Sequence, residues 1–256
     1  MMLPIEKIEK KVYERTKDIR FVSHGFDHLK RTAIGAKWFA QVFGGSESQQ
    51  SIAYTAGLVH DFERPRSEKI EHKGISASEA REFLKQFDFD SEIKKKIIKL
   101  VEEHRYVSNL PLIDQVLFLS DKILEQSGAF IIFRRCVYTG ECIDFEGKPF
   151  FESITTHWKA RMARFKPQVY NQKVSRLANY QYSWQLRFFK AFENSEDWAA
   201  DIAKQCYEEG KKQKKNIIQI IENIETNGEG NDFKKEALLY IKGKKFDEFK
   251  KLVSKS

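Results

Sequence analysis

The chain has 256 residues, and its 45 Lys and Arg outnumber its 37 Asp and Glu to give a net charge of +8. This length suits one large domain or a domain with an extension, and a hydrophobic content of 41% excludes a disordered chain. The low numbers of Gly (13) and Pro (5) disfavour turn-rich all-β folds and favour helices.

Apolar residues at helical spacing recur along the first half of the chain. The helices expected there cover residues 4–19, 28–43, 50–60, 76–87 and 92–104. Ser91 is expected to cap the last of them, because a serine hydroxyl accepts from the free N–H groups of a first turn. A long apolar helix is then expected from near Pro111 to about Tyr138.

The second half is also predicted to be helical. Residues 140–149 have the composition of a loop or a short hairpin, and helical patterns follow at 184–192 and 196–225. The longer pattern has room for two helices, and a helical pair is expected over 233–253. The fold class predicted from these patterns is all-α.

The surplus charge lies mostly after residue 128. Residues 148–190 contain nine basic side chains, one acidic side chain and ten aromatic residues. Basic and aromatic side chains in alternation suit single-stranded nucleic acid, which offers phosphates and bases. The same pattern is expected for amphipathic helices whose rings form a core, and we favour that interpretation. A third interpretation is a lid whose cations reach a bound phosphate.

The sequence lacks the patterns of a membrane span, a signal peptide and a disulfide framework. No apolar run reaches the roughly 18 residues that a membrane span needs, and the N-terminus is charged where a signal peptide is apolar. The three cysteines are scattered without metal-site spacing, which indicates a reducing compartment. The sequence therefore predicts a cytoplasmic protein with no membrane partner.

Histidines are the main functional signal, because five of the six fall between residues 24 and 104. His60 and Asp61 end an apolar helical stretch, and His28 lies at the start of an earlier one. Asp121 lies inside the apolar run VLFLSDKIL, where a buried carboxylate needs a cation or hydrogen-bond donors. A metal ion would meet this need. The alternative is an ion pair with a nearby basic residue, Lys122 or Arg31.

In this order the residues resemble the HD-domain superfamily of metal-dependent phosphohydrolases, whose pattern is His, then His-Asp, then Asp. The matching segments are HGFDHLKRT (24–32), AGLVHDFERP (56–65) and FLSDKI (118–123), with HKGISASEAREFL (72–84) and KLVEEHRY (99–106) between them. The resemblance implies an HD-domain helical bundle over residues 1–140 and a C-terminal helical extension over residues 141–256.

The resemblance also implies a set of metal ligands: His28, His60, Asp61 and Asp121. His72 and His104 match positions that hold a second metal in binuclear members. One departure concerns spacing. The family usually has a glycine six residues after the last ligand, whereas Gly128 lies seven residues after Asp121, so a one-residue shift in that helix is expected.

Imidazole and carboxylate ligands suit Mn²⁺, Fe²⁺, Ni²⁺, Co²⁺ or Zn²⁺, and Mg²⁺ is a further candidate. The residues expected to act in catalysis are Asp61, which would accept a proton from metal-bound water, Arg31 and His104. The residues expected to bind substrate or line its pocket are Arg31, His24, Lys73 and Arg64. Two arginines after the last ligand helix are candidates for closing the pocket, Arg134 and Arg135.

The function predicted from this resemblance is hydrolysis of a phosphate ester or anhydride of a nucleotide or another small molecule. Two other enzymatic hypotheses are an HD nuclease that holds single-stranded nucleic acid through residues 148–190 and a diiron HD oxygenase. A non-enzymatic hypothesis is a binding or regulatory protein with a degenerate site, and the complete set of ligand residues argues against it.

Overall fold

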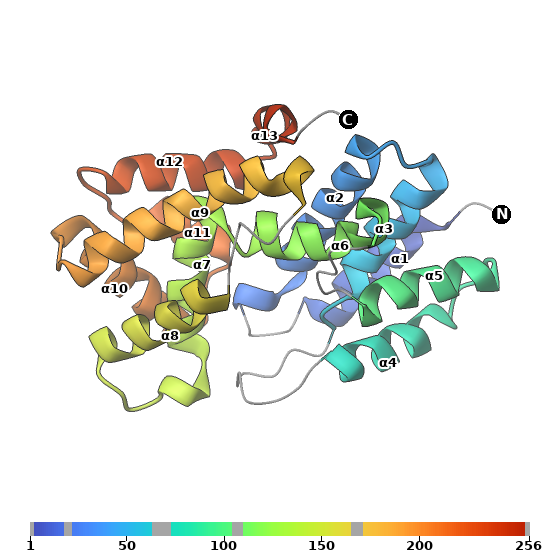
Figure 1. The fold of residues 1–256 in the computed structure, drawn as a ribbon. Coiled ribbons are helices and arrows are strands. Elements are labelled where there is room, and N and C mark those ends of the chain that lie inside the picture. The colour runs from blue at the N-terminus through green and yellow to red at the C-terminus, as the bar shows by residue number, and fades with distance from the viewer. Residues whose placement is uncertain (1–2, 18–21, 63–72, 104–109, 165–170, 254–256) are drawn as a thin grey trace. The chain divides into compact units, whose positions relative to one another are not determined.

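The computed structural model describes residues 3–17, 22–62, 73–103, 110–164 and 171–253. Over these ranges all regular secondary structure is helical, which confirms the all-α prediction (Figure 1). None of the helices in these ranges has the length and apolar character needed to span a bilayer. The chain divides into two compact units: unit 1 is Met1–Ile19 with His24–Leu124, and unit 2 is Arg20–Ser23 with Glu125–Ser256.

Unit 1 follows the helices expected from apolar spacing. They are α1 (Ile5–Thr16), α2 (Phe26–Val42), α3 (Glu47–Val59), α4 (Lys73–Leu84), α5 (Ser91–Glu102) and the short α6 (Val116–Leu119). Helix α3 packs against both α2 and α5, and α6 packs against α2. The shared core includes Leu29, Ala33, Leu58, Ile97 and Leu117.

Two helices of unit 1, α3 and α5, begin at residues whose side chains cap them. Ser46 begins α3 with a capping box, in which its side chain and that of Gln49 bond each other's backbone N–H groups. The predicted cap of α5 was wrong. Asp90 caps this helix through its carboxylate, which accepts from Glu92 N and Ile93 N, and Ser91 is the first helical residue.

The continuous helix expected from Pro111 to Tyr138 was also wrong. The segment contains a 3₁₀ turn η2 (Leu112–Gln115), α6, and a π-helical turn η3 (Ser120–Glu125). A new helix, α7 (Gly128–Glu141), then begins after an extended Ser127. Gly128 has a φ of +74°, a left-handed conformation that only glycine adopts readily, so the helix breaks there.

Unit 2 is arranged around α7, which is buried along almost its whole length. The helices α8 (Phe150–Arg164), α9 (Gln172–Glu193), α10 (Asp197–Lys212), α11 (Ile217–Asn223) and α12 (Gly230–Ile241) all contact it, and α13 (Phe246–Leu252) packs on α9. A 3₁₀ turn η4 (Ile143–Phe145) lies in the predicted loop. The boundary expected near residue 140, between the HD-domain bundle and the C-terminal extension, lies at the end of α7 and so inside unit 2.

The basic and aromatic segment forms α8 and α9. Trp158, Phe188 and Phe189 are buried, and Trp158 packs against Phe188. Phe151 is half-exposed and stacks on Phe192. Of the eight rings that the structure describes in this segment, three are buried, four are half-buried and one is exposed, whereas most of its described lysines and arginines are exposed.

Candidate metal centre

Two histidines come together because α2 and α3 pack closely. His28 lies in the first turn of α2, and His60 is the residue that ends α3. Gly57, one turn before His60, lies directly against the backbone of Ala33 on α2, where a Cβ atom would overlap it. Both histidine rings are buried, and their centroids are 5.1 Å apart.

The third member of the group is carried by the π turn. Asp121 is the second residue of η3 and is almost fully buried. A π turn closes i→i+5 hydrogen bonds, so it contains one residue more than an α turn, and such turns are frequent at functional sites. The one-residue shift expected from the spacing of Asp121 and Gly128 therefore has a structural counterpart in this turn.

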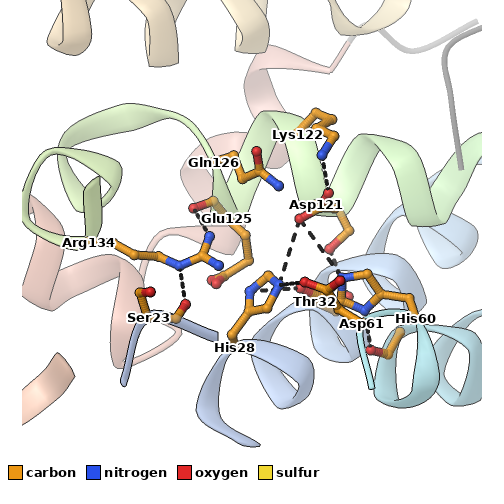
Figure 2. Close-up of polar contacts among 12 residues, drawn as sticks. Ser23, His28, Thr32, His60, Asp61, Asp121, Lys122, Glu125, Gln126 and Arg134 are labelled. Carbon is orange, nitrogen blue, oxygen red and sulfur yellow. Dashed lines mark hydrogen bonds and ion pairs between the residues drawn. The ribbon is translucent and has the colours of Figure 1, made fainter. Parts of the chain in front are cut away.

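The three side chains converge in unit 1 (Figure 2). Asp121 Oδ1 lies 3.9 Å from His28 Nε2 and 4.0 Å from His60 Nε2. These distances are too long for hydrogen bonds. Two ligand atoms bound to one cation at about 2.0–2.2 Å lie at most about 4.4 Å apart. All three ligand atoms lie within 4.8 Å of one another, so the group can hold a metal ion after a small closure.

The histidine rings are oriented for this role. His60 Nδ1 lies 2.9 Å from the carbonyl oxygen of Gly57, and a neutral ring that donates there presents the lone pair of Nε2 to a cation. His28 Nδ1 lies 3.4 Å from the hydroxyl of Thr32, one turn along α2. Hydrogen bonds of this kind fix ring orientation at metal sites.

Asp121 also has a direct ionic partner, which is one of the two that the sequence offered. Lys122 Nζ lies 2.6 Å from Asp121 Oδ2, so one carboxylate oxygen faces the histidines and the other faces the ammonium (Figure 2). Burial alone would raise the pKa of the Asp121 carboxyl. Lys122, His60 and His28 outweigh it and hold this pKa well below its usual value. Asp121 is therefore a carboxylate at neutral pH.

The remaining predicted residues lie in several places. Asp61 is buried, with Oδ2 4.0 Å from His28 Nε2. The ring of His24 is buried and 5.5 Å from that of His28, and Arg31 is half-buried on α2. Lys73 begins α4, but its side chain is not described. Three predicted residues lie outside the described part of the chain, namely Arg64, His72 and His104.

The two arginines considered for pocket closure are buried within unit 2 and bond backbone carbonyls there. Arg134 Nε donates to Ser23 O at 2.6 Å, and Arg135 Nη2 donates to His157 O at 3.3 Å. The sequence offered Lys122 as an ionic partner of Asp121 but not as a residue that binds substrate. Thr32 and Gly57 carried no signal, because their contribution depends on how α2 and α3 pack.

A comparison with protein-family models matches residues 25–125 to the family described as HD domain. This range contains all four predicted ligands of the first metal. No curated protein matches the chain in a sequence search.

Among solved structures, the chain is similar to two crystal structures of Bacillus subtilis YpgQ, one of them in complex with ADP. Each is 19% identical to the chain and has a TM-score of 0.54, and each match covers 76% of this chain. The matches cover 99% of the ADP-complex chain and 96% of the other. At this identity the likeness concerns the fold.

Proposed function

We propose that the protein is a metal-dependent phosphohydrolase of a nucleotide or another phosphorylated small molecule, because residues 25–125 match the HD domain family. The observation that carries the proposal is the buried group of His28, His60 and Asp121. Two imidazoles and a carboxylate are the donor set of catalytic zinc, manganese and iron sites.

The residues divide the work of such a site between them. His28, His60 and Asp121 hold the cation, and Asp61 completes the set from beside His28. A bound divalent cation lowers the pKa of water to about 7, which supplies hydroxide at neutral pH. We assign Asp61 to accept the proton from that water, because its carboxylate Oδ2 lies 4.0 Å from His28 Nε2.

Positive side chains are needed to hold the substrate phosphate, and unit 1 offers one in direct contact with a proposed ligand. Lys122 Nζ lies 2.6 Å from Asp121 Oδ2, and its side chain is 25% exposed. We add Lys122 to the proposed substrate-binding residues Arg31, His24, Lys73 and Arg64. His104 stays proposed as a catalytic residue, and with His72 as a ligand of a second metal.

A nucleotide is the favoured substrate class. The chain resembles the fold of YpgQ, which was crystallised with ADP. The alternative of single-stranded nucleic acid requires rings that are free to stack on bases. Among the described rings of residues 148–190 only Phe151 is exposed, and it stacks on Phe192.

The test is a hydrolysis screen with nucleotides and other phosphate esters across Mn²⁺, Fe²⁺, Co²⁺, Ni²⁺, Zn²⁺ and Mg²⁺. We expect metal-dependent release of phosphate or pyrophosphate that is lost in His60→Ala and Asp61→Ala. His157→Ala is the matched control, because His157 is also buried but bonds Thr139 within unit 2. Activity that survives in His60→Ala and Asp61→Ala would show that the site is assigned wrongly. Tightly bound iron with O₂ consumption and no hydrolysis would favour the oxygenase hypothesis.

A further inference from the structure

A serine hydroxyl ties the turn that carries Asp121 to the helix that carries His28. Ser120 is fully buried, and its Oγ donates to the carbonyl oxygen of Thr32 at 2.7 Å. Thr32 lies one turn after His28 on α2, and its own hydroxyl is 3.4 Å from His28 Nδ1. One hydrogen bond and one helical turn thus connect the residue before Asp121 to the His28 ring.

A glycine on α2 makes this contact possible. A Cβ atom at Gly35 would overlap Ser120 Oγ and lie 2.9 Å from Leu124 Cδ1. The side chains of Ser120 and Leu124 therefore occupy the space that a larger residue at position 35 would need. A π turn with i→i+5 hydrogen bonds is rare and occurs mostly as a single turn. We therefore expect contacts from outside η3 to fix the direction in which Asp121 points.

We propose that Ser120 is a positioning residue of the metal site, whose hydrogen bond to Thr32 holds Asp121 Oδ1 opposite the two histidines. The inference rests on the metal site of the proposed function. Loss of the bond leaves every ligand in place but frees η3 from α2. Residues that orient metal ligands from behind typically change metal affinity by about 10–100-fold when they are removed.

The experiment compares Ser120→Ala with Ser153→Ala. Ser153 is an equally buried serine that donates to a backbone carbonyl, that of Pro149 at 2.9 Å, and it lies in unit 2. Affinities for Co²⁺ and Mn²⁺ are measured on the full chain by competition with a chelator, together with the Co²⁺ absorption spectrum and the melting temperature of metal-free protein. We expect Ser120→Ala to lower metal affinity by at least about tenfold and to alter the Co²⁺ spectrum. Ser153→Ala is expected to lower only the melting temperature.

A second variant reaches the same contact from the opposite side. Gly35→Ala places a methyl group where the Ser120 hydroxyl lies, so it is expected to weaken metal binding in the same way, and it serves if Ser120→Ala does not fold. Metal affinity and a Co²⁺ spectrum equal to wild type in either folded variant would overturn the inference. Wild-type protein that binds no metal would overturn it together with the proposed function. Absence of hydrolysis, with the expected changes in metal affinity, would remove only the proposed function.

Discussion

Two buried carboxylates, one in each unit, differ in what surrounds their oxygens. Glu141 in unit 2 has donors at contact distance on both oxygens, whereas Asp121 in unit 1 contacts Lys122 through Oδ2 and faces two histidines at about 4 Å through Oδ1. In unit 2, Glu141 accepts from Val22 N at 2.6 Å and from Ser23 Oγ at 2.6 Å, and Lys245 lies 2.9 Å from Glu236. In the site of unit 1, the histidines stand 3.9 and 4.0 Å from Asp121 Oδ1. Contact distance satisfies a buried charge and stabilises the fold. A separation near 4 Å between buried ligand atoms leaves space for a cation between them.

The largest effect is expected from Asp121→Asn. The substitution keeps the size of the side chain but removes the negative charge that faces both histidines. Removing a residue that only orients a metal ligand typically lowers metal affinity by about 10–100-fold. Loss of a ligand itself is therefore expected to lower metal affinity by about 100-fold or more. Calorimetric titration with Mn²⁺ and phosphohydrolase assays measure this loss. Unchanged metal affinity would mean that the separation in unit 1 does not mark a metal site.

Glu141→Ala tests whether the close contacts of a buried carboxylate in unit 2 stabilise the fold. The substitution removes the acceptor of the half-buried Val22 N–H and of the buried N–H and hydroxyl of Ser23. A buried donor left without its acceptor costs about 1–3 kcal/mol in the free energy of unfolding. Urea denaturation of the metal-free protein measures it. A loss below about 1 kcal/mol would show that contact distance in unit 2 does not report stabilisation.

Two close helix crossings offer a matched pair of glycines. Gly57 lies against Ala33 where α2 meets α3, and Gly140 lies against the backbone of Tyr207 where α7 meets α10. Overpacking by one methyl group typically costs about 1–3 kcal/mol, so both Gly57→Ala and Gly140→Ala should lower the melting temperature. Only Gly57→Ala separates the helices that carry His28 and His60, so only this variant should also weaken Co²⁺ binding. Equal metal affinities in the two variants would contradict this distinction.

Two lysines with ionic partners make a similar pair. Lys122 contacts Asp121 at 2.6 Å and is 25% exposed, whereas Lys245 is buried among Glu236, Glu248 and Tyr180. We expect Lys122→Met to raise the KM for the phosphorylated substrate by about tenfold. We expect Lys245→Met to cost about 1–3 kcal/mol of unfolding free energy, with KM unchanged. Steady-state kinetics and urea denaturation of both variants measure these effects. An unchanged KM in Lys122→Met together with a raised KM in Lys245→Met would refute the assignment.

Much of the fold could be predicted from local pattern, because apolar spacing located most helices of unit 1. The resemblance to the HD-domain superfamily, and not local pattern, implied that His28, His60 and Asp121 meet. The prediction of one helix from Pro111 to Tyr138 was wrong, because apolar content alone does not show where the backbone changes from α-helical to 3₁₀ or π hydrogen bonding. The seven-residue spacing to Gly128 indicated a shift, but its form as a π turn depends on contacts with α2.

Other parts of the site depend on tertiary packing that no local pattern reports. Gly35 and Gly57 look like ordinary helix interruptions in the sequence, and only the approach of η3 and α3 to α2 explains them. Ser120 likewise reads as one more small residue in an apolar run. Asp90 and Ser91 are both good caps, and the backbone conformation of Asp90 decides between them.

The smallest expected effect concerns pH and the ionic network of unit 2. Burial and a hydrogen bond of 2.7 Å to Glu236 raise the pKa of Tyr180 to about 12, from about 10 in an unfolded chain. A raised pKa of an acid means that the native state favours the neutral phenol. The resulting stability is complete below pH 10 and is lost as the pH rises through about 12. Tyr180→Phe removes this contribution, so its melting temperature should fall less steeply than that of wild type between about pH 10 and pH 12. Titration of tyrosine absorbance at alkaline pH checks the assignment, and identical slopes in the two proteins would show that Tyr180 titrates as an exposed phenol.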